Sequence, residues 1–242
     1  MKQYDAIAQY YDLVMKSGYY NHTQAAHSLN NIIKTRKKVL EIGLGTGLLA
    51  EKLLDINPNY DLTGLEYSPA MLERSKARLA NRARVLEGNV LSLDLEESFD
   101  IVYSHAGPLG FDLIDNDYHM YSFITNLEGT IKLLRNLADY LVNRGLLVLS
   151  IQSEETDADQ QRDIGNSIVY SQKSYISSLD DKEMYFWEKD YIFKKREELL
   201  ASERHKFLML HGQMLESTMK IGGFQLKEVA SENAYLVYQK MI

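Results

Sequence analysis

The stretch Val39-Leu40-Glu41-Ile42-Gly43-Leu44-Gly45-Thr46-Gly47 decides the fold of this chain. An apolar run containing an acid is followed by three alternating glycines, and a helical pattern then begins at once. Residues 62–66, Leu-Thr-Gly-Leu-Glu, form a second apolar run that ends in another carboxylate. This order predicts a strand, a glycine turn, a helix and a neighbouring parallel strand, because glycine lets the backbone turn sharply and come close to a ligand.

The two carboxylates indicate which kind of ligand the turn receives. Glu66, at the tip of the second strand, can accept hydrogen bonds from both hydroxyls of a ribose. Dinucleotide enzymes use the spacing G-x-G-x-x-G, whereas here the glycines alternate and Leu48 stands where the third dinucleotide glycine would fall. Glu41 would repel a pyrophosphate but suits a ligand with positive charge. A positively charged nucleoside cofactor is therefore favoured over NAD.

Composition places the chain among ordinary globular proteins. Its 242 residues suffice for one α/β domain with an insertion. The net charge of −7 disfavours a nucleic-acid partner, and the absence of cysteine excludes disulfides and thiol nucleophiles. Residues 1–5 lack the apolar core of a signal peptide, and no apolar run approaches the ~18 residues of a membrane helix. We expect a cytoplasmic protein without a membrane partner.

The pattern of apolar residues divides the chain into three parts. Residues 1–36 are predicted to form a helical, tyrosine-rich cover. Residues 37–151 and 211–242 alternate strands and helices, which predicts a parallel sheet with right-handed crossovers. Residues 152–210 break this rhythm and are dense in aromatic side chains. We expect them to be an inserted antiparallel sheet.

The elements of these parts follow from the same pattern. Core strands are expected at 38–42, 61–66, 83–87, 99–104, 145–151, 224–230 and 234–239. A loop is expected at 105–111, and helices at about 121–142 and 211–221. The inserted strands are expected at 168–178, 184–193 and 197–208. Three inserted strands would then follow the fifth core strand.

The spacing Glu-x-Gly-x-Gly-x-Gly at 41–47 resembles motif I of class I S-adenosylmethionine (SAM)-dependent methyltransferases. The tyrosine-rich phrase at 4–12 and the closing helix-Gly-Gly-Phe unit at 211–224 are similar to the same family. The resemblance implies an α/β, Rossmann-like methyltransferase fold, with a seven-stranded, mostly parallel sheet whose last strand is antiparallel. It also implies SAM as the cofactor and S-adenosylhomocysteine as its product. Small-molecule types, glycine N-methyltransferase-like or natural-product methyltransferases, carry a comparable insertion.

The resemblance assigns cofactor-binding residues as well. Glu66 stands at the position of the family's ribose-binding acid. Asn89 takes the position that meets the adenine amino group, where aspartate is commoner, and Asp94 is a competing candidate. The implied cofactor-binding set is Tyr11, Glu41, Gly43, Gly45, Gly47, Glu66, Tyr67, Met71, Asn89, Val90, Ser104 and His105.

Methyl transfer from a sulfonium is an in-line displacement, so a base is needed only if the nucleophile holds its proton. His105 directly follows the fourth strand, where open α/β sheets keep their sites, and an ordinary histidine pKa of about 6.5 suits a base. An ordinary loop histidine is an equal alternative. The residues expected to bind substrate are Tyr4, Trp187, Tyr191 and His211. The insertion would be a substrate lid or a dimer interface, although core packing explains its aromatics equally well.

The loop after the fourth strand limits the choice of substrate and metal. Its sequence Ser-His-Ala-Gly at 104–107 differs from the Pro-Pro-Tyr type of nucleic-acid methyltransferases. Asp112, Asp115 and Asp117 lie along one stretch and resemble a calcium loop at best, so no metal is expected. We expect a monomer or homodimer that methylates an oxygen or nitrogen of a small molecule. A SAM-binding protein without catalysis and an NAD-dependent oxidoreductase stay open as alternatives.

Overall fold

The computed structural model describes residues 4–152, 159–179, 182–230 and 234–242. Its helices are α1 (Ala8–Val14), the π-helix η1 (Met15–Tyr19), α2 (His22–Ile33), α3 (Leu48–Ile56), α4 (Pro69–Leu79), α5 (Leu127–Asp139) and α7 (Gly212–Ile221). Its first strands are β1 (Lys38–Ile42), β2 (Asp61–Glu66), β3 (Arg84–Glu87), β4 (Phe99–Ser104), β5 (Leu109–Ile114), β6 (Asp117–Ser122) and β7 (Leu141–Gln152). The others are β8 (Gln160–Asp163), β9 (Ile168–Ser178), β10 (Met184–Lys195), β11 (Glu198–Leu210), β12 (Phe224–Ala230) and β13 (Tyr235–Lys240).

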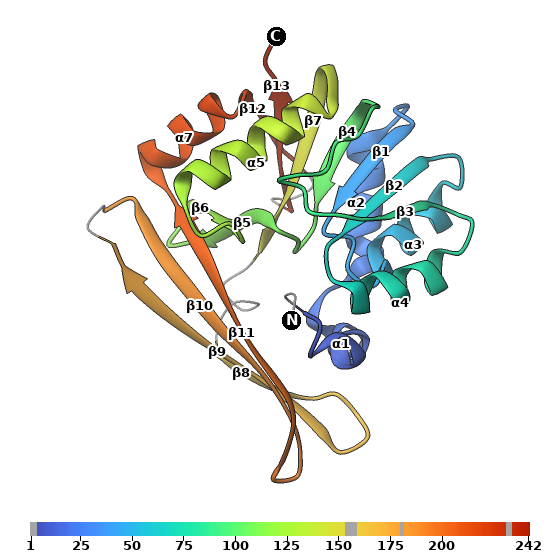
Figure 1. Cartoon of the computed structure of the whole chain (residues 1–242), viewed down its shortest axis with the longest axis vertical. Coiled ribbons are helices and arrows are strands. Elements are labelled where there is room, and N and C mark those ends of the chain that lie inside the picture. The colour runs from blue at the N-terminus through green and yellow to red at the C-terminus, as the bar shows by residue number, and fades with distance from the viewer. Residues whose placement is uncertain (1–3, 153–158, 180–181, 231–233) are drawn as a thin grey trace.

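The core is a Rossmann-like sheet with helices on both faces (Figure 1). Strands β3, β2, β1, β4 and β7 run parallel in that order, and β13 pairs antiparallel with both β7 and β12. Within the described residues this gives the seven-stranded, mostly parallel sheet with an antiparallel last strand that the sequence predicts. The fold class is confirmed.

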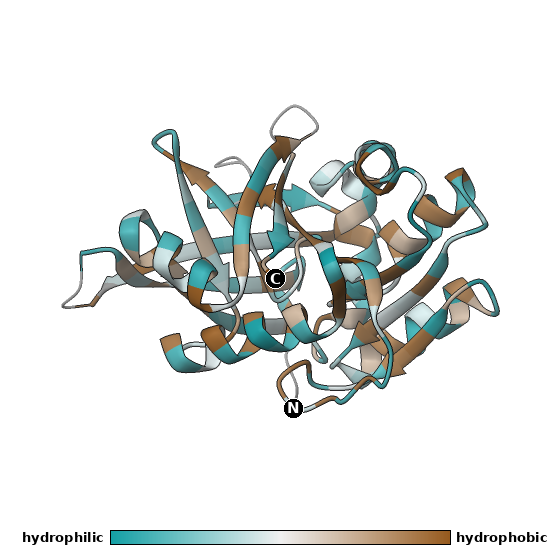
Figure 2. Cartoon of the chain, turned by 90° about the horizontal axis from the view of Figure 1, so that it is seen from above, coloured by the Kyte–Doolittle hydropathy of each residue, from teal (hydrophilic) through white to brown (hydrophobic). Residues whose placement is uncertain are grey.

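Each face of β1 packs against a different set of helices. Leu40 and Ile42 belong to one apolar cluster with Leu137 of α5, whereas Val39 belongs to a second cluster with Leu29 of α2. Successive side chains of a strand point to opposite faces, so one short strand binds both helical layers to the sheet. Figure 2 shows apolar residues where the helices meet the strands and polar ones on the outer turns.

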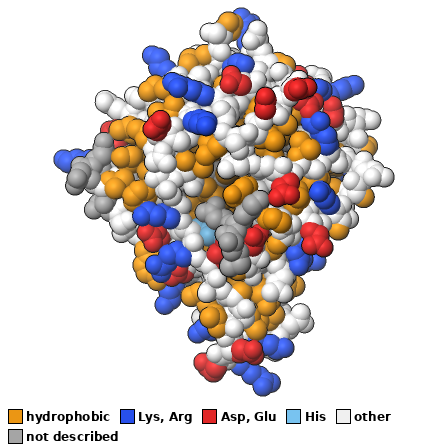
Figure 3. Space-filling model, in the orientation of Figure 1, with side chains coloured by type: hydrophobic (Ala, Val, Ile, Leu, Met, Phe, Trp, Pro, Cys, Tyr) orange, Lys and Arg blue, Asp and Glu red, His pale blue; other side chains and the backbone are white. Residues whose placement is uncertain are grey.

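The inserted strands form a long antiparallel ribbon that leaves the core in one direction (Figure 1), and the space-filling view in the same orientation narrows toward the end of this ribbon (Figure 3). The three predicted strands are present as β9, β10 and β11, paired with each other along nearly their whole length. The structure adds the short strand β8 and joins the ribbon to the core through β5 and β6. The expected boundaries at 152 and 211 fall at the end of β7 and the start of α7.

The hairpin β5–β6 corrects two predictions. Residues 105–111 were expected to be loop and 121–142 helix, but β5 begins at Leu109 and α5 spans only Leu127–Asp139. Asp115 and Asn116 have φ angles of 50° and 65°, so they form a two-residue hairpin turn in which the backbone needs positive φ twice. Asp and Asn tolerate this conformation better than most residues, which explains the acidic run without a calcium loop.

Among the described residues, no helix has the length and apolar character needed to cross a membrane.

Candidate functional site

The glycine turn after β1 takes a shape that only glycine allows. Gly43, Gly45 and Gly47 have φ angles of 72°, 57° and 78°, all in the left-handed region. A Cβ on Gly43 would lie 2.4 Å from Cδ of Pro108, so this turn packs tightly on the loop after β4. A Cβ on Gly45 would meet nothing within 4 Å, although Gly45 lines a cavity. The backbone at Gly45 is thus open to a ligand.

Glu66 ties this turn to the tip of β2. Its carboxylate accepts hydrogen bonds from the backbone N–H groups of Gly45 (2.7 Å), Tyr67 (2.8 Å) and Ser68 (2.7 Å). Burial raises the pKa of this carboxyl, although the three N–H donors favour the charged form. A buried carboxylate that also lines the cavity is fitted to accept a hydroxyl from a ligand there.

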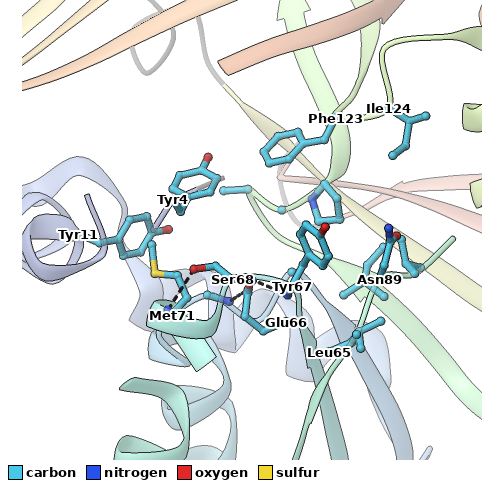
Figure 4. Close-up of a pocket in the computed structure, with 18 residues that line it drawn as sticks. Tyr4, Tyr11, Leu65, Glu66, Tyr67, Ser68, Met71, Asn89, Phe123 and Ile124 are labelled. Atoms are coloured by element: carbon cyan, nitrogen blue, oxygen red, sulfur yellow. Dashed lines mark hydrogen bonds between the residues drawn. The ribbon is translucent and has the colours of Figure 1, made fainter. Parts of the chain in front are cut away.

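The cavity lies at the carboxyl ends of the parallel strands (Figure 4). It is lined by Tyr4, Tyr11, Ile42, Gly43, Gly45, Leu65, Glu66, Tyr67, Ser68, Met71, Gly88, Asn89, Val90, Ala106, Gly107, Pro108, Phe123 and Ile124. Eight of the twelve expected cofactor residues are therefore brought together, and Tyr4 joins them. Phe123 and Ile124 were missed by sequence reasoning, because they were expected inside a helix.

Four expected cofactor residues do not line the cavity. Gly47 is the N-cap of α3, and Ser104 is fully buried. Glu41 is buried and accepts a 2.7 Å hydrogen bond from the Tyr103 hydroxyl, and burial raises its pKa to about 8. The fourth is His105. Their roles toward the cofactor stay predictions.

The helical cover is fixed directly to the glycine turn. The Thr46 hydroxyl donates to Asp12 of α1 (2.6 Å), and the Arg78 guanidinium binds both Asp12 and the Thr46 carbonyl. The Ser68 hydroxyl donates to Asp5 (2.6 Å) and, as the N-cap of α4, accepts from Met71 N–H. These contacts hold the rings of Tyr4 and Tyr11 against the cavity (Figure 4).

His105 faces away from this cavity. Its Nδ1 lies 3.0 Å from the Tyr235 hydroxyl, and its ring contacts Tyr20 and His22 edge-on. Burial, and then the neighbouring His22, lower the pKa of His105 to about 3. A base works best when its pKa lies near the working pH, so this environment suits a packing role. The assignment as catalytic base stays a prediction that turnover of His105→Ala tests.

The buried imidazole has a consequence for stability. The folded His105 stays neutral down to about pH 3, whereas the unfolded chain takes up a proton below about pH 6.5. The contribution of His105 is therefore present above pH 6.5 and lost as the pH falls. When the pH is lowered from 7 to 5, we expect the thermal midpoint of His105→Asn to fall less than that of the wild type. Parallel melting curves check this difference, and identical slopes would contradict it.

A second cavity adjoins the first. The two share Tyr4, Ala106, Gly107 and Phe123. The other residues lining the second are Tyr19, Tyr20, Asp112, Tyr121, Gln152, Trp187, Lys189, Tyr191, Phe207 and Met209. Trp187 and Tyr191, both expected at the substrate, are among them. The ammonium of Lys189 lies 4.4 Å from the centre of the Trp187 ring and is itself buried.

A histidine–glutamate pair lies behind Tyr4. His205 of β11 is completely buried, with Nε2 2.9 Å from Glu203, and the same carboxylate accepts the backbone N–H of Tyr4 at 2.5 Å. The Tyr4 ring meets the His205 ring edge-on at 4.3 Å. The pairing of His205 with Glu203 depends on the fold and leaves no local signal in the sequence.

His211 lies elsewhere. It is the N-cap of α7, beside Asp117 and His119, and lines neither cavity. Its expected role at the substrate stays a prediction without support from this geometry.

Comparison with known proteins places this site in a family. The model of a methyltransferase domain matches residues 39–122, from β1 to the end of β6. Residues 39–122 are a class I methyltransferase domain. This assignment confirms the expected family, the enzyme class and SAM as the cofactor. The alternating glycines, Glu66 and the open backbone at Gly45 fit that cofactor.

Curated relatives carry the same domain. A malonyl-[acyl-carrier protein] O-methyltransferase of Bacillus cereus is 27% identical over 205 residues, which cover 74% of this chain and 70% of that protein. One of Acetivibrio thermocellus is 36% identical over 124 residues, 48% of this chain and 36% of that protein. The chain thus spans between about a third and 70% of the relatives it matches.

Solved structures share the fold over almost the whole chain. DesVI of Streptomyces venezuelae superposes with a TM-score of 0.71 at 18% identity, covering 97% of this chain and 98% of that one. SAM-bound CalS10, an amino pentose methyltransferase of Micromonospora echinaspora, gives 0.65 at 16% identity and 96% of both chains. The similarity therefore extends through the inserted ribbon.

Proposed function

We propose that this methyltransferase transfers the methyl group of SAM to a nitrogen or oxygen of a small molecule held in the second cavity. The observation that carries the proposal is the shared wall of the two cavities at Tyr4, Ala106, Gly107 and Phe123. A cofactor beside Glu66 and a molecule beside Trp187 would meet across this wall. An in-line displacement requires such a meeting of donor and acceptor.

The lining of the second cavity supports a small substrate. It is mostly aromatic, and it lies between the core and the base of the ribbon. Aromatic faces exclude water from the reacting groups and attract the positive charge of an amine or a sulfonium. Asp112 and Lys189 add one side chain of each charge to the same wall, both buried. Together these side chains can orient a small polar molecule.

SAM supplies an electrophilic methyl group when it is bound. The chain's own residues then position and enclose the reactants. Glu66 and the glycine turn orient the nucleoside part, the cover closes one side through Asp12 and Thr46, and Tyr4 lies at the junction of the cavities. If the acceptor keeps its proton, the His205–Glu203 pair behind Tyr4 could receive it.

Activity is tested with methyl-labelled SAM and a panel of acceptors. The panel contains amino sugars and a malonyl thioester, which represent the names of the structural neighbours and curated relatives, and hydroxylated aromatics as a further class. Labelled product with matching S-adenosylhomocysteine supports the proposal. Tight SAM binding without product from any class favours a non-catalytic SAM-binding protein.

The placement of the substrate is tested with Trp187→Ala. We expect KM for the acceptor to rise about tenfold, because a buried aromatic wall is lost, while the Kd for SAM changes less than about twofold. Leu199→Ala on β11 is the matched control, since this side chain is 56% exposed and lines neither cavity. Equal KM values for the two variants would remove the second cavity from substrate binding.

A further inference from the structure

Outside both cavities, three metal-binding side chains meet on the face of the molecule where α7 begins. Asp117, His119 and His211 each offer one ligand atom, and these atoms lie within 4.8 Å of one another. Asp117 is well exposed, while the two histidines are half-buried. None of the three lines either cavity, so the methyl-transfer site does not account for them.

The backbone alone brings these residues together. Asp117 and His119 are separated by two positions on β6, so their side chains leave the same face of the strand. Strand β11 pairs antiparallel with β6 through Leu210 and Met120, and the next residue, His211, continues this register opposite His119. The rings of His119 and His211 stack with centres 4.4 Å apart. The cluster therefore follows from strand pairing.

Hydrogen bonds on their outer sides orient both rings, and the one made by His211 fixes which of its nitrogens can bind a metal. Nε2 of His211 lies 3.0 Å from the Lys182 carbonyl, which can only accept, so this nitrogen carries the hydrogen. Nδ1 of His211 is then unprotonated in the neutral ring, and it lies 3.8 Å from Oδ2 of Asp117. Nδ1 of His119 is 2.9 Å from the Tyr185 hydroxyl. Outer partners of this kind orient metal-binding histidines in many proteins.

The spacing and the ligand types also suit a metal. Ligand atoms about 2.1 Å from a tetrahedral ion lie about 3.4 Å apart, so the 3.8 Å pair needs only a small adjustment. Two imidazoles and one carboxylate favour Zn²⁺ over Ca²⁺ or Mg²⁺, which prefer oxygen ligands.

We propose that Asp117, His119 and His211 form a binding site for a Zn²⁺-type divalent ion. The ion joins the tip of the β5–β6 hairpin to the start of α7. Glu183 already holds the start of α7, since its carboxylate accepts from Met214 N–H and its carbonyl from His211 N–H. Asp112 and Tyr121 of the same hairpin line the second cavity, so the ion would stiffen that wall from outside.

The test uses chelator-treated full-length protein and Co²⁺ as a spectroscopic probe, followed by calorimetry with Zn²⁺. We expect micromolar binding, a visible Co²⁺ band typical of nitrogen ligands and a higher thermal midpoint with Zn²⁺. His211→Ala and His119→Ala should each weaken Zn²⁺ binding by about a hundredfold, and Asp117→Asn by about tenfold. His27→Ala, an exposed histidine on α2, is the matched control and should bind as the wild type does.

Two results would overturn the proposal. One is the absence of Zn²⁺ binding at micromolar concentrations to the chelator-treated wild type. The other is equal Zn²⁺ affinity in His211→Ala, Asp117→Asn and His27→Ala, which would place the ion elsewhere. Because Asp117 is exposed at the end of a strand, Asp117→Asn keeps the test valid if a histidine variant does not fold. Circular dichroism of each variant establishes its folding before titration.

Discussion

Replacing Glu66 with glutamine is expected to weaken SAM binding by about a hundredfold or more. The carboxylate accepts three backbone N–H groups in the native turn, and a glutamine side chain presents an NH₂ group to one side of this arrangement. A charge-assisted hydrogen bond to the ribose is lost at the same time. Calorimetric titration with SAM, S-adenosylhomocysteine and NAD measures the effect.

Glu87→Gln is the matched control for this variant. Glu87 ends β3, is paired with Glu66 in the sheet, and is exposed outside the cavity. Its change should leave the Kd for SAM within about twofold of the wild type. If both variants bind SAM normally, Glu66 does not hold the cofactor. Tight NAD binding to the wild type without a response to SAM would contradict the cofactor itself.

Gly43→Ala is expected to lower the free energy of unfolding by about 3 kcal/mol or more and to abolish SAM binding. Two costs add here. Alanine is strained at a φ of 72°, and its Cβ would lie 2.4 Å from Pro108 Cδ and 3.1 Å from Gly107 Cα. Relief of this overlap has to move the loop that forms one wall of the cavity. Denaturant unfolding and SAM titration measure the two effects.

Two other glycines separate these costs. Gly165 has a φ of 89° in a turn between β8 and β9, where a Cβ would meet nothing within 4 Å. Gly165→Ala should therefore show only the cost of backbone strain, about 1 to 2 kcal/mol. Gly45→Ala should show a similar loss of stability, yet lose SAM binding, because its Cβ would project into the cavity. Normal SAM binding by Gly45→Ala would contradict the position assigned to the cofactor.

Local sequence signals were sufficient for the core and for most of the cofactor cavity. The alternating glycines act through their own backbone, and Glu66 acts at the end of its own strand, so a single sequence reveals them. The hairpin β5–β6 was missed because its turn, Asp115-Asn116, also fits an acidic loop. Its second strand, β6, is stabilised by pairing with β11, about ninety residues later in the chain, and that pairing leaves no local signal.

Glu41 shows why a motif does not fix where a side chain points. Leu40 and Ile42 both pack in the cluster that includes α5, so the residue between them has to face the other side of the sheet. There its carboxylate meets the Tyr103 hydroxyl. His205 shows the same kind of limit, since only the fold places it behind Tyr4.

The attachment of the helical cover to the glycine turn has a consequence for the rate of turnover. Asp12 binds both Thr46 and Arg78, so we expect exchange of spent for fresh cofactor to open this ion pair. Such opening is a gating step, and in many enzymes a step of this kind, with product release, limits turnover. The rate of this protein would then depend on salt and viscosity more than on the reactivity of its acceptor.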